Sequence, residues 1–229
     1  MDATPADRLT ELRVAALARS WHLAGDNRHY FADTYAMMTA AMVAEVNAGT
    51  FLDNPWVGRL VGRFTDYYLD AVRDSESGGA CPPAWTEAFE ACSRSEHHLQ
   101  LIMLGINAHI NNDLVFALCD VMSDWNSLGE EVRQVRRADY LAVNNVIALL
   151  VDRMQEELVN ARDPVLGVLD RLLGPSDEWL FRRLVTTWRD SAWEDGCRLL
   201  SSTSDSERQQ LRSEIIERAG RNGRLISAL

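Results

Sequence analysis

Apolar residues recur at intervals of three and four along most of the chain, the spacing that places them on one face of an α-helix. Residues 5–20 show this pattern first, with Leu9, Leu12 and Leu17 on a shared face. No segment alternates polar and apolar residues for long enough to predict a strand. Short runs rich in Gly, Pro, Asn, Asp and Ser separate the helical segments. The sequence therefore predicts helices joined by short connections.

Several helix ends can be placed from start and stop signals. Asp26 is the expected cap of a helix over about 26–48, which Gly49 ends. Asn54 and Pro55 have the form of a cap followed by proline, and they open a helix that runs to about Asp74. Later helices are predicted over about 84–94, 128–160, 177–200 and 204–220, with a short one over 164–173 and a flexible tail at about 220–229.

The segment over about 96–125 is apolar enough to be the buried central helix of such a fold. Its two apolar ends, LQLIMLGI and LVFALC, enclose a polar stretch with Asn107, His109, Asn111, Asn112 and Asp113. We therefore predict one all-α domain over 1–229, a bundle of about seven or eight helices around this segment. A buried polar group costs about 1–3 kcal/mol unless it finds a partner, so the stretch is either a satisfied structural network or a functional site.

Charge and composition exclude several functions. The formal net charge of −11 argues against nucleic acid and against anionic membrane surfaces as partners. All 23 basic residues are arginine, and without lysine the chain cannot perform Schiff-base or pyridoxal-phosphate chemistry or form a Walker-type phosphate loop. A small-molecule substrate is the remaining expectation, and the oligomeric state is left open.

The expected location is the cytoplasm. The N-terminal residues MDATPADRLTEL lack the basic start and apolar run of a secretory signal. No run of 18 or more apolar residues predicts a transmembrane helix. The four cysteines show no C-x-x-C spacing and are expected to be free thiols in a reducing compartment.

Within the polar stretch, His109 and Asp113 are four residues apart, so their side chains can meet on one face of a helix. A carboxylate that accepts one imidazole N–H fixes the tautomer of the ring, which suits a general base and equally a metal ligand. His29 and Asp33 repeat this spacing. Gly105, one turn before His109, removes bulk and leaves room for a ligand or a close neighbour.

Metal sites with known helical signatures are not supported. The Glu-x-x-His pairs of ferritin-like di-metal proteins and the H-E-x-x-H motif of zinc proteases are both absent from the sequence. We therefore predict no cofactor. If a single metal ion binds, His109 and Asp113 are its expected ligands.

The segment LGINAHINNDL also resembles the signature Gly-x-Asn-Ala-His-Ile-Asn-x-Asp-Leu of a bacterial family of unknown function. The match falls on Gly105, Asn107, Ala108, His109, Ile110, Asn111, Asp113 and Leu114. Three further segments are similar to the family and extend the resemblance over about 25–200: FTDYYLDA, DYLAVNNVIA with Asp139 and Asn144, and WRDSAW with Arg189 and Trp193. The resemblance implies an all-helical fold and a convergence of His109, Asp113, Asp139, Asn144 and Arg189, but it supplies no activity.

Taken together, these patterns favour a small-molecule enzyme that performs cofactor-independent acid–base chemistry of the lyase, isomerase or cyclase type. His109 and Asp113 are the predicted catalytic pair. The predicted substrate-binding residues are Asn107, Asn112, Asp139, Asn144, Arg189 and Trp193. Two alternatives stay open: metal-dependent hydrolysis at the same pair, and a non-catalytic binding or interaction protein whose polar network is structural.

Overall fold

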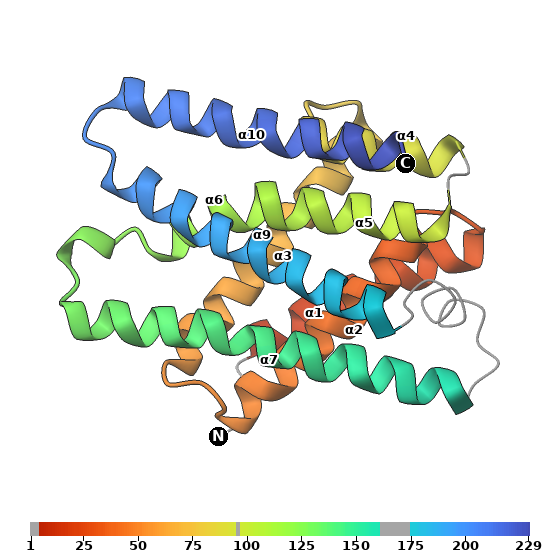
Figure 1. Ribbon diagram of the computed structural model, residues 1–229, viewed down its shortest axis with the longest axis horizontal. Helices are drawn as coiled ribbons and strands as arrows, with labels where there is room; N and C mark the ends of the chain where they lie inside the picture. The colour runs from red at the N-terminus through yellow and green to blue at the C-terminus, as the bar shows by residue number, and fades with distance from the viewer. Residues whose placement is uncertain (1–4, 95–96, 161–174) are drawn as a thin grey trace.

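The computed structural model describes residues 5–94, 97–160 and 175–229, with side chains at 8–94, 97–150 and 181–229. Every regular element in these ranges is a helix (Figure 1). The α-helices are α1 (Pro5–Ala24), α2 (His29–Ala48), α3 (Asn54–Ser77), α4 (Pro83–Arg94), α5 (His98–Ala108), α6 (Leu114–Val121), α7 (Glu130–Asn160), α9 (Pro175–Ser201) and α10 (Asp205–Ser227). A π-helix (His109–Asp113) joins α5 to α6 without a break, so the described residues form eight separate helices. The predicted all-α bundle is confirmed.

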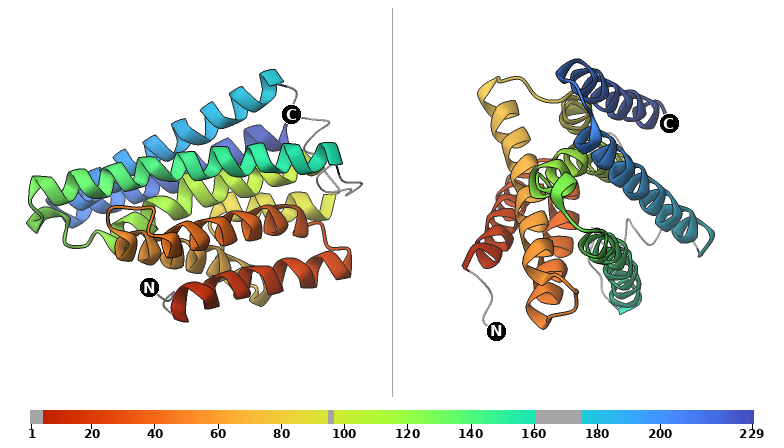
Figure 2. Two further views of the ribbon diagram at one scale, coloured as in Figure 1. Left: turned by 90° about the horizontal axis from the view of Figure 1, so that it is seen from below. Right: turned by 90° about the vertical axis from the view of Figure 1, so that its left-hand side faces the viewer.

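The continuous segment of α5, the π-helix and α6 is the central helix of the fold. The view along the long axis shows it with α1–α3 on one side, α4 and α10 on a second, and α7 and α9 on a third (Figure 2). Its length and composition, over His98–Val121, would allow it to cross a membrane, but 83% of its most apolar stretch is buried inside the protein. Burial of this kind is expected for the core helix of a bundle, which meets the same criterion.

Two hydrophobic clusters share the central helix. One surrounds α6 and includes Trp56, Leu118 and Tyr140, which are fully buried. The other surrounds α5 and includes Tyr68 and Trp85. Because each face of the central helix is covered by apolar side chains, the polar stretch at its middle lies deep inside the molecule, as the sequence predicted.

Two predicted helix starts are shifted by local capping. α2 begins at His29 rather than at Asp26, because the Asp26 carboxylate accepts the backbone N–H of Arg28 at 2.9 Å and also binds its guanidinium. The cap of α3 is Asp53 rather than Asn54, since Asp53 Oδ1 accepts the N–H of Trp56 at 3.0 Å.

The prediction of a flexible tail at about 220–229 is wrong, because α10 continues to Ser227. Gly220 and Gly223 are buried inside α10 and let it approach α4 and α5 closely: a Cβ at Gly220 would lie 3.1 Å from Pro83. Gln100 Nε2 also donates to the carbonyl of Ile226 at 2.7 Å. The short helix predicted over 164–173 lies outside the described residues.

Candidate functional site

The polar stretch of the central helix is a five-residue π-helix, His109–Asp113. The N–H of Leu114 bonds to the carbonyl of His109, five residues earlier, rather than to that of residue 110. Such insertions are rare inside α-helices and occur frequently at functional sites. One turn before it, Gly105 accommodates the ring of Phe31, because a Cβ at Gly105 would lie 2.3 Å from that ring. The space left by the absent side chain of Gly105 is therefore filled by a neighbouring residue, which is one of the two expectations, rather than left open for a ligand.

His109 and Asp113 are joined as the spacing predicted. His109 Nδ1 lies 2.9 Å from Asp113 Oδ2, and the same oxygen accepts the Nε1–H of Trp85 at 2.9 Å. Asn112 Nδ2 donates to the other oxygen, Oδ1, also at 2.9 Å. An ionised carboxylate can only accept, so the proton of the imidazole lies on Nδ1. The orientation and the tautomer of the His109 ring are thereby fixed.

The other imidazole nitrogen, His109 Nε2, is buried and has no hydrogen-bond partner in the described part of the chain. Burial lowers the pKa of His109, and the hydrogen bond and charge of Asp113 only partly oppose this. The ring is therefore neutral near pH 7, with a free lone pair on Nε2. Phe64 stacks on it with ring centroids 3.5 Å apart, and Tyr35 meets it edge-on at 4.4 Å.

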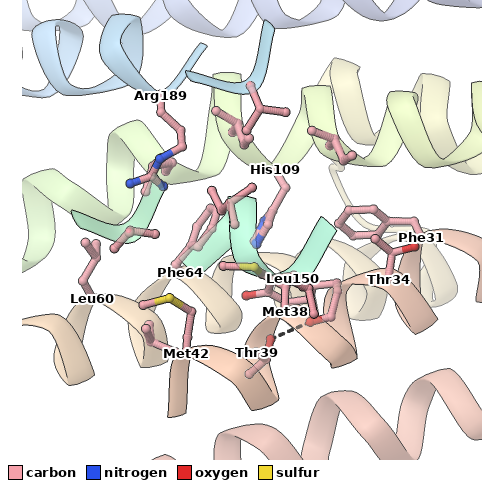
Figure 3. Close-up of a pocket in the computed structure, with 18 of the residues that line it drawn as sticks. Phe31, Thr34, Met38, Thr39, Met42, Leu60, Phe64, His109, Leu150 and Arg189 are labelled. Carbon is pink, nitrogen blue, oxygen red and sulfur yellow. Dashed lines mark hydrogen bonds between the residues drawn. The ribbon is translucent and has the colours of Figure 1, made fainter. Parts of the chain in front are cut away.

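A cavity of about 180 Å³ lies against this ring, between the central helix and α2, α3, α7 and α9 (Figure 3). Its walls are almost entirely apolar and include Met38, Met42, Leu60, Phe64, Ile147 and Phe181. Among the described residues that line the cavity, only His109 and Arg189 carry a basic group, and none is acidic. The cavity thus combines an apolar interior with one proton acceptor and one cation.

Arg189 enters the cavity from α9 and is only 5% exposed. Its Nε donates to Asn144 Oδ1 at 2.7 Å and its Nη2 donates to the carbonyl of Tyr140 at 2.8 Å. The guanidinium also lies 4.4 Å above the Tyr140 ring. Burial lowers the pKa of Arg189, and no carboxylate of the described chain lies within salt-bridge distance of it.

The predicted site residues divide into two groups. His109 and Arg189 line the cavity. Asp113 orients His109, and Asn144 orients Arg189. Asn112 in turn donates a hydrogen bond to Asp113. Of the five residues that the resemblance implied, two line this cavity and two bond to the lining residues, while Asp139 lies elsewhere. The cavity does not include the remaining predicted substrate-binding residues, Asn107, Asp139 and Trp193.

These three residues have structural partners instead. Asn107 Nδ2 donates to the carbonyl of Ala219 at 3.0 Å and so ties the central helix to α10. The Asp139 carboxylate accepts the backbone N–H groups of Leu52 and Asp53 at 2.8 and 2.7 Å, which fixes the connection before α3. The Trp193 ring packs against the rings of other core residues, Trp56, Trp125 and Tyr140.

The structure also shows which groups could hold a metal ion. Asp113 bonds to Nδ1 of His109 and accepts two further N–H donors, whereas the unpartnered nitrogen of that ring is Nε2, so Nε2 is the ligand atom that this pair leaves free. A separate group, His22, His29 and Asp33, places its ligand atoms within 4.8 Å of one another. There Nδ1 of each histidine lies near the same oxygen, Asp33 Oδ2, at 3.1 and 2.8 Å.

Sequence reasoning missed most of the cavity wall. Met38, Met42, Phe64 and Ile147 have the helical spacing of ordinary core residues, and nothing in the pattern separates a cavity wall from a packed interior. Trp85, which donates to Asp113, looked like one more apolar residue of a short helix. The only available signal was the similarity to the family of the segment FTDYYLDA, which contains Phe64.

Comparison with known proteins gives one match. No curated protein and no solved structure matches the chain. Residues 9–229 match the model of the family DUF5995, a longer region than the resemblance over about 25–200. The chain therefore belongs to the family of unknown function DUF5995.

Proposed function

We propose that this chain is a small-molecule enzyme in which His109 transfers a proton without a cofactor, in a reaction of the lyase, isomerase or cyclase type. The observation that carries the proposal is the state of the two ring nitrogens. Nδ1 donates to Asp113, while Nε2 is buried without a partner on the wall of a cavity. A buried acceptor without a partner costs about 1–3 kcal/mol, so its retention suggests a role with a bound molecule.

The surroundings support proton transfer at Nε2. The lowered pKa keeps the ring neutral near pH 7, so Nε2 is available to accept a proton from a bound molecule. As the ring becomes positively charged, its hydrogen bond to the Asp113 carboxylate strengthens, which stabilises the imidazolium. Arg189, on the same wall, would stabilise negative charge that develops on the substrate.

Metal-dependent hydrolysis at the same pair is the weaker alternative, because Asp113 is engaged by three N–H donors on the side of the ring opposite Nε2. A non-catalytic binding protein would use the same apolar cavity but would not need a free Nε2. We place the reaction in the cytoplasm, a choice that the four free cysteines support.

The test is exchange of carbon-bound hydrogen for deuterium. A panel of small molecules that bind the protein would be incubated with it in D₂O and followed by mass spectrometry. His109→Asn retains a donor to Asp113 in the place of Nδ1 and deletes Nε2, so the exchange rate should fall by about 10²–10⁴-fold. His98→Asn is the matched control, since His98 pairs with Tyr30 at 2.7 Å, away from the cavity.

A hydrogen–deuterium exchange rate that is unchanged in His109→Asn would contradict the proposal. An equal fall in the exchange rate of His98→Asn would also contradict it. Binding of several molecules with no exchange in any of them would favour the non-catalytic alternative.

A further inference from the structure

Among the residues that the structure describes, Arg189 and Arg136 are the two buried arginines, and Arg189 is the one without an acidic partner, since Arg136 binds Asp124 at 2.8 Å. Arg28 binds Asp26 and Glu76, and Arg63 binds Asp120 at 2.6 Å. Arg189 is more deeply buried than either, yet its two hydrogen bonds go to neutral oxygens, of Asn144 and of the Tyr140 backbone. An isolated buried charge is costly, and proteins normally pair it or expose it. The missing counter-ion is therefore a feature that needs a cause.

The guanidinium is also held in one orientation. Asn144 and Tyr140 occupy Nε and Nη2, and the Tyr140 ring supports its flat face, while Nη1 makes no hydrogen bond to the described residues. Figure 3 shows Arg189 at one end of the cavity, with His109 between it and Phe31 in this view. A fixed cation with a free donor at the end of an apolar cavity is arranged to receive an anionic group from outside the chain.

We propose that the cavity binds a small monocarboxylate, with the carboxylate on Arg189 and an apolar body along His109 toward Phe31. The inference shares its cavity with the proposed function and names the class of substrate. A cavity of about 150 Å³ holds a benzene molecule, so a cavity of about 180 Å³ fits an aromatic ring or a short aliphatic chain.

The chemistry of the walls favours a carboxylate over a phosphate. A phosphate ester carries up to two charges and three acceptor oxygens, which usually require several donors. The described walls offer one cation, and the chain has no lysine to add. A single guanidinium matches the one charge and two oxygens of a carboxylate. The apolar interior in turn excludes ligands with polar groups along their length.

The test compares acids with their neutral amides at pH 7 by isothermal titration calorimetry. The probes are benzoate, phenylacetate and hexanoate, each against the amide of nearly the same shape. The wild-type protein should bind at least one acid ten or more times tighter than its amide, about 1.4 kcal/mol. Because this comparison needs no variant, it decides the proposal even if every substitution affects folding.

Asn144→Asp sharpens the test, because it places a carboxylate on Arg189 Nε with almost no change in shape. With this internal counter-ion, the acid and its amide should bind with about equal dissociation constants while the guanidinium stays in place. Asn145→Asp is the matched control, because it adds the same charge at the next position, where the side chain is exposed. The control should keep the wild-type preference.

Equal binding of acids and amides, or no binding of any probe, would overturn the proposal. Loss of the preference in Asn145→Asp as well would also overturn it, since the effect would then be one of overall charge. The two proposals fail separately. His109→Asn should keep the preference for acids, so an absence of proton exchange with this preference intact would contradict only the proposed function.

Discussion

Two histidine–aspartate pairs with identical spacing have different surroundings in this protein. His29 and Asp33 in α2 are joined at 2.8 Å, and His109 and Asp113 in the π-helix at 2.9 Å. A glycine precedes each histidine by four residues. The side chains of the first pair are 11% and 23% exposed, while those of the second are 4% and 1% exposed.

The difference lies in what the rest of the fold adds to each pair. Asp33 has a second histidine, His22, as its neighbour, in a half-exposed group at the start of α2. Asp113 accepts hydrogen bonds from Trp85 and Asn112, and its partner His109 lines the apolar cavity. Spacing alone therefore specifies the hydrogen bond, whereas burial and the neighbouring helices decide whether the second ring nitrogen is available for chemistry.

The largest expected difference between the pairs is in stability. Asp113→Ala would leave three buried N–H donors without an acceptor, so the free energy of unfolding should fall by about 3–5 kcal/mol. Asp33→Ala should cost less than about 1 kcal/mol, because its partners can bond to water. Urea denaturation of both variants measures this. Similar losses in the two would show that the environments are equivalent.

The two glycines should also differ. Gly105→Ala forces a Cβ to within 2.3 Å of Phe31, and such overpacking should cost about 1–3 kcal/mol. Gly25 has φ +65° and open space around it, so Gly25→Ala should cost about 1 kcal/mol through backbone strain alone. Adding Phe31→Leu should recover part of the loss in Gly105→Ala and none in Gly25→Ala. Recovery in neither would contradict the packing explanation.

Acid should weaken the fold through His109. The pKa of its side chain is near 6.5 in the unfolded chain and lower in the folded protein, because burial disfavours the charged ring. As the pH falls below 6.5, the unfolded chain binds a proton that the folded protein does not. Stability should therefore drop by up to about 1.4 kcal/mol per pH unit until the folded pKa is reached, and His109 should contribute no slope above 6.5.

The measurement is urea denaturation of the wild type and of His109→Asn over a series of pH values. Subtracting the two curves removes the other titrating groups. A difference that stays flat as the pH falls would show that the pKa of His109 is not lowered by folding.

The sequence allowed the helices and the His109–Asp113 bond to be predicted, because both follow from local periodicity. The π-helix was not predicted, because the residues on both sides of its inserted residue are buried all round and no exposed polar stripe records the shift in helical phase. Asp139 is among the predicted substrate-binding residues because its segment resembles the family, and the sequence cannot show that its carboxylate instead accepts the backbone N–H groups of Leu52 and Asp53. The cavity depends on how five helical segments pack, which no single segment encodes.

Proton transfer in this cavity depends on His109 presenting an unprotonated Nε2 to it. Nitrogen-15 NMR of the imidazole rings at pH 7 measures this directly, with His109→Asn identifying the resonances. We expect Nδ1 of His109 to show the chemical shift of a protonated ring nitrogen and Nε2 that of an unprotonated one, with the Nε2 signal moving when a carboxylate probe binds. A proton on Nε2, or a signal that no cavity ligand affects, would contradict the account.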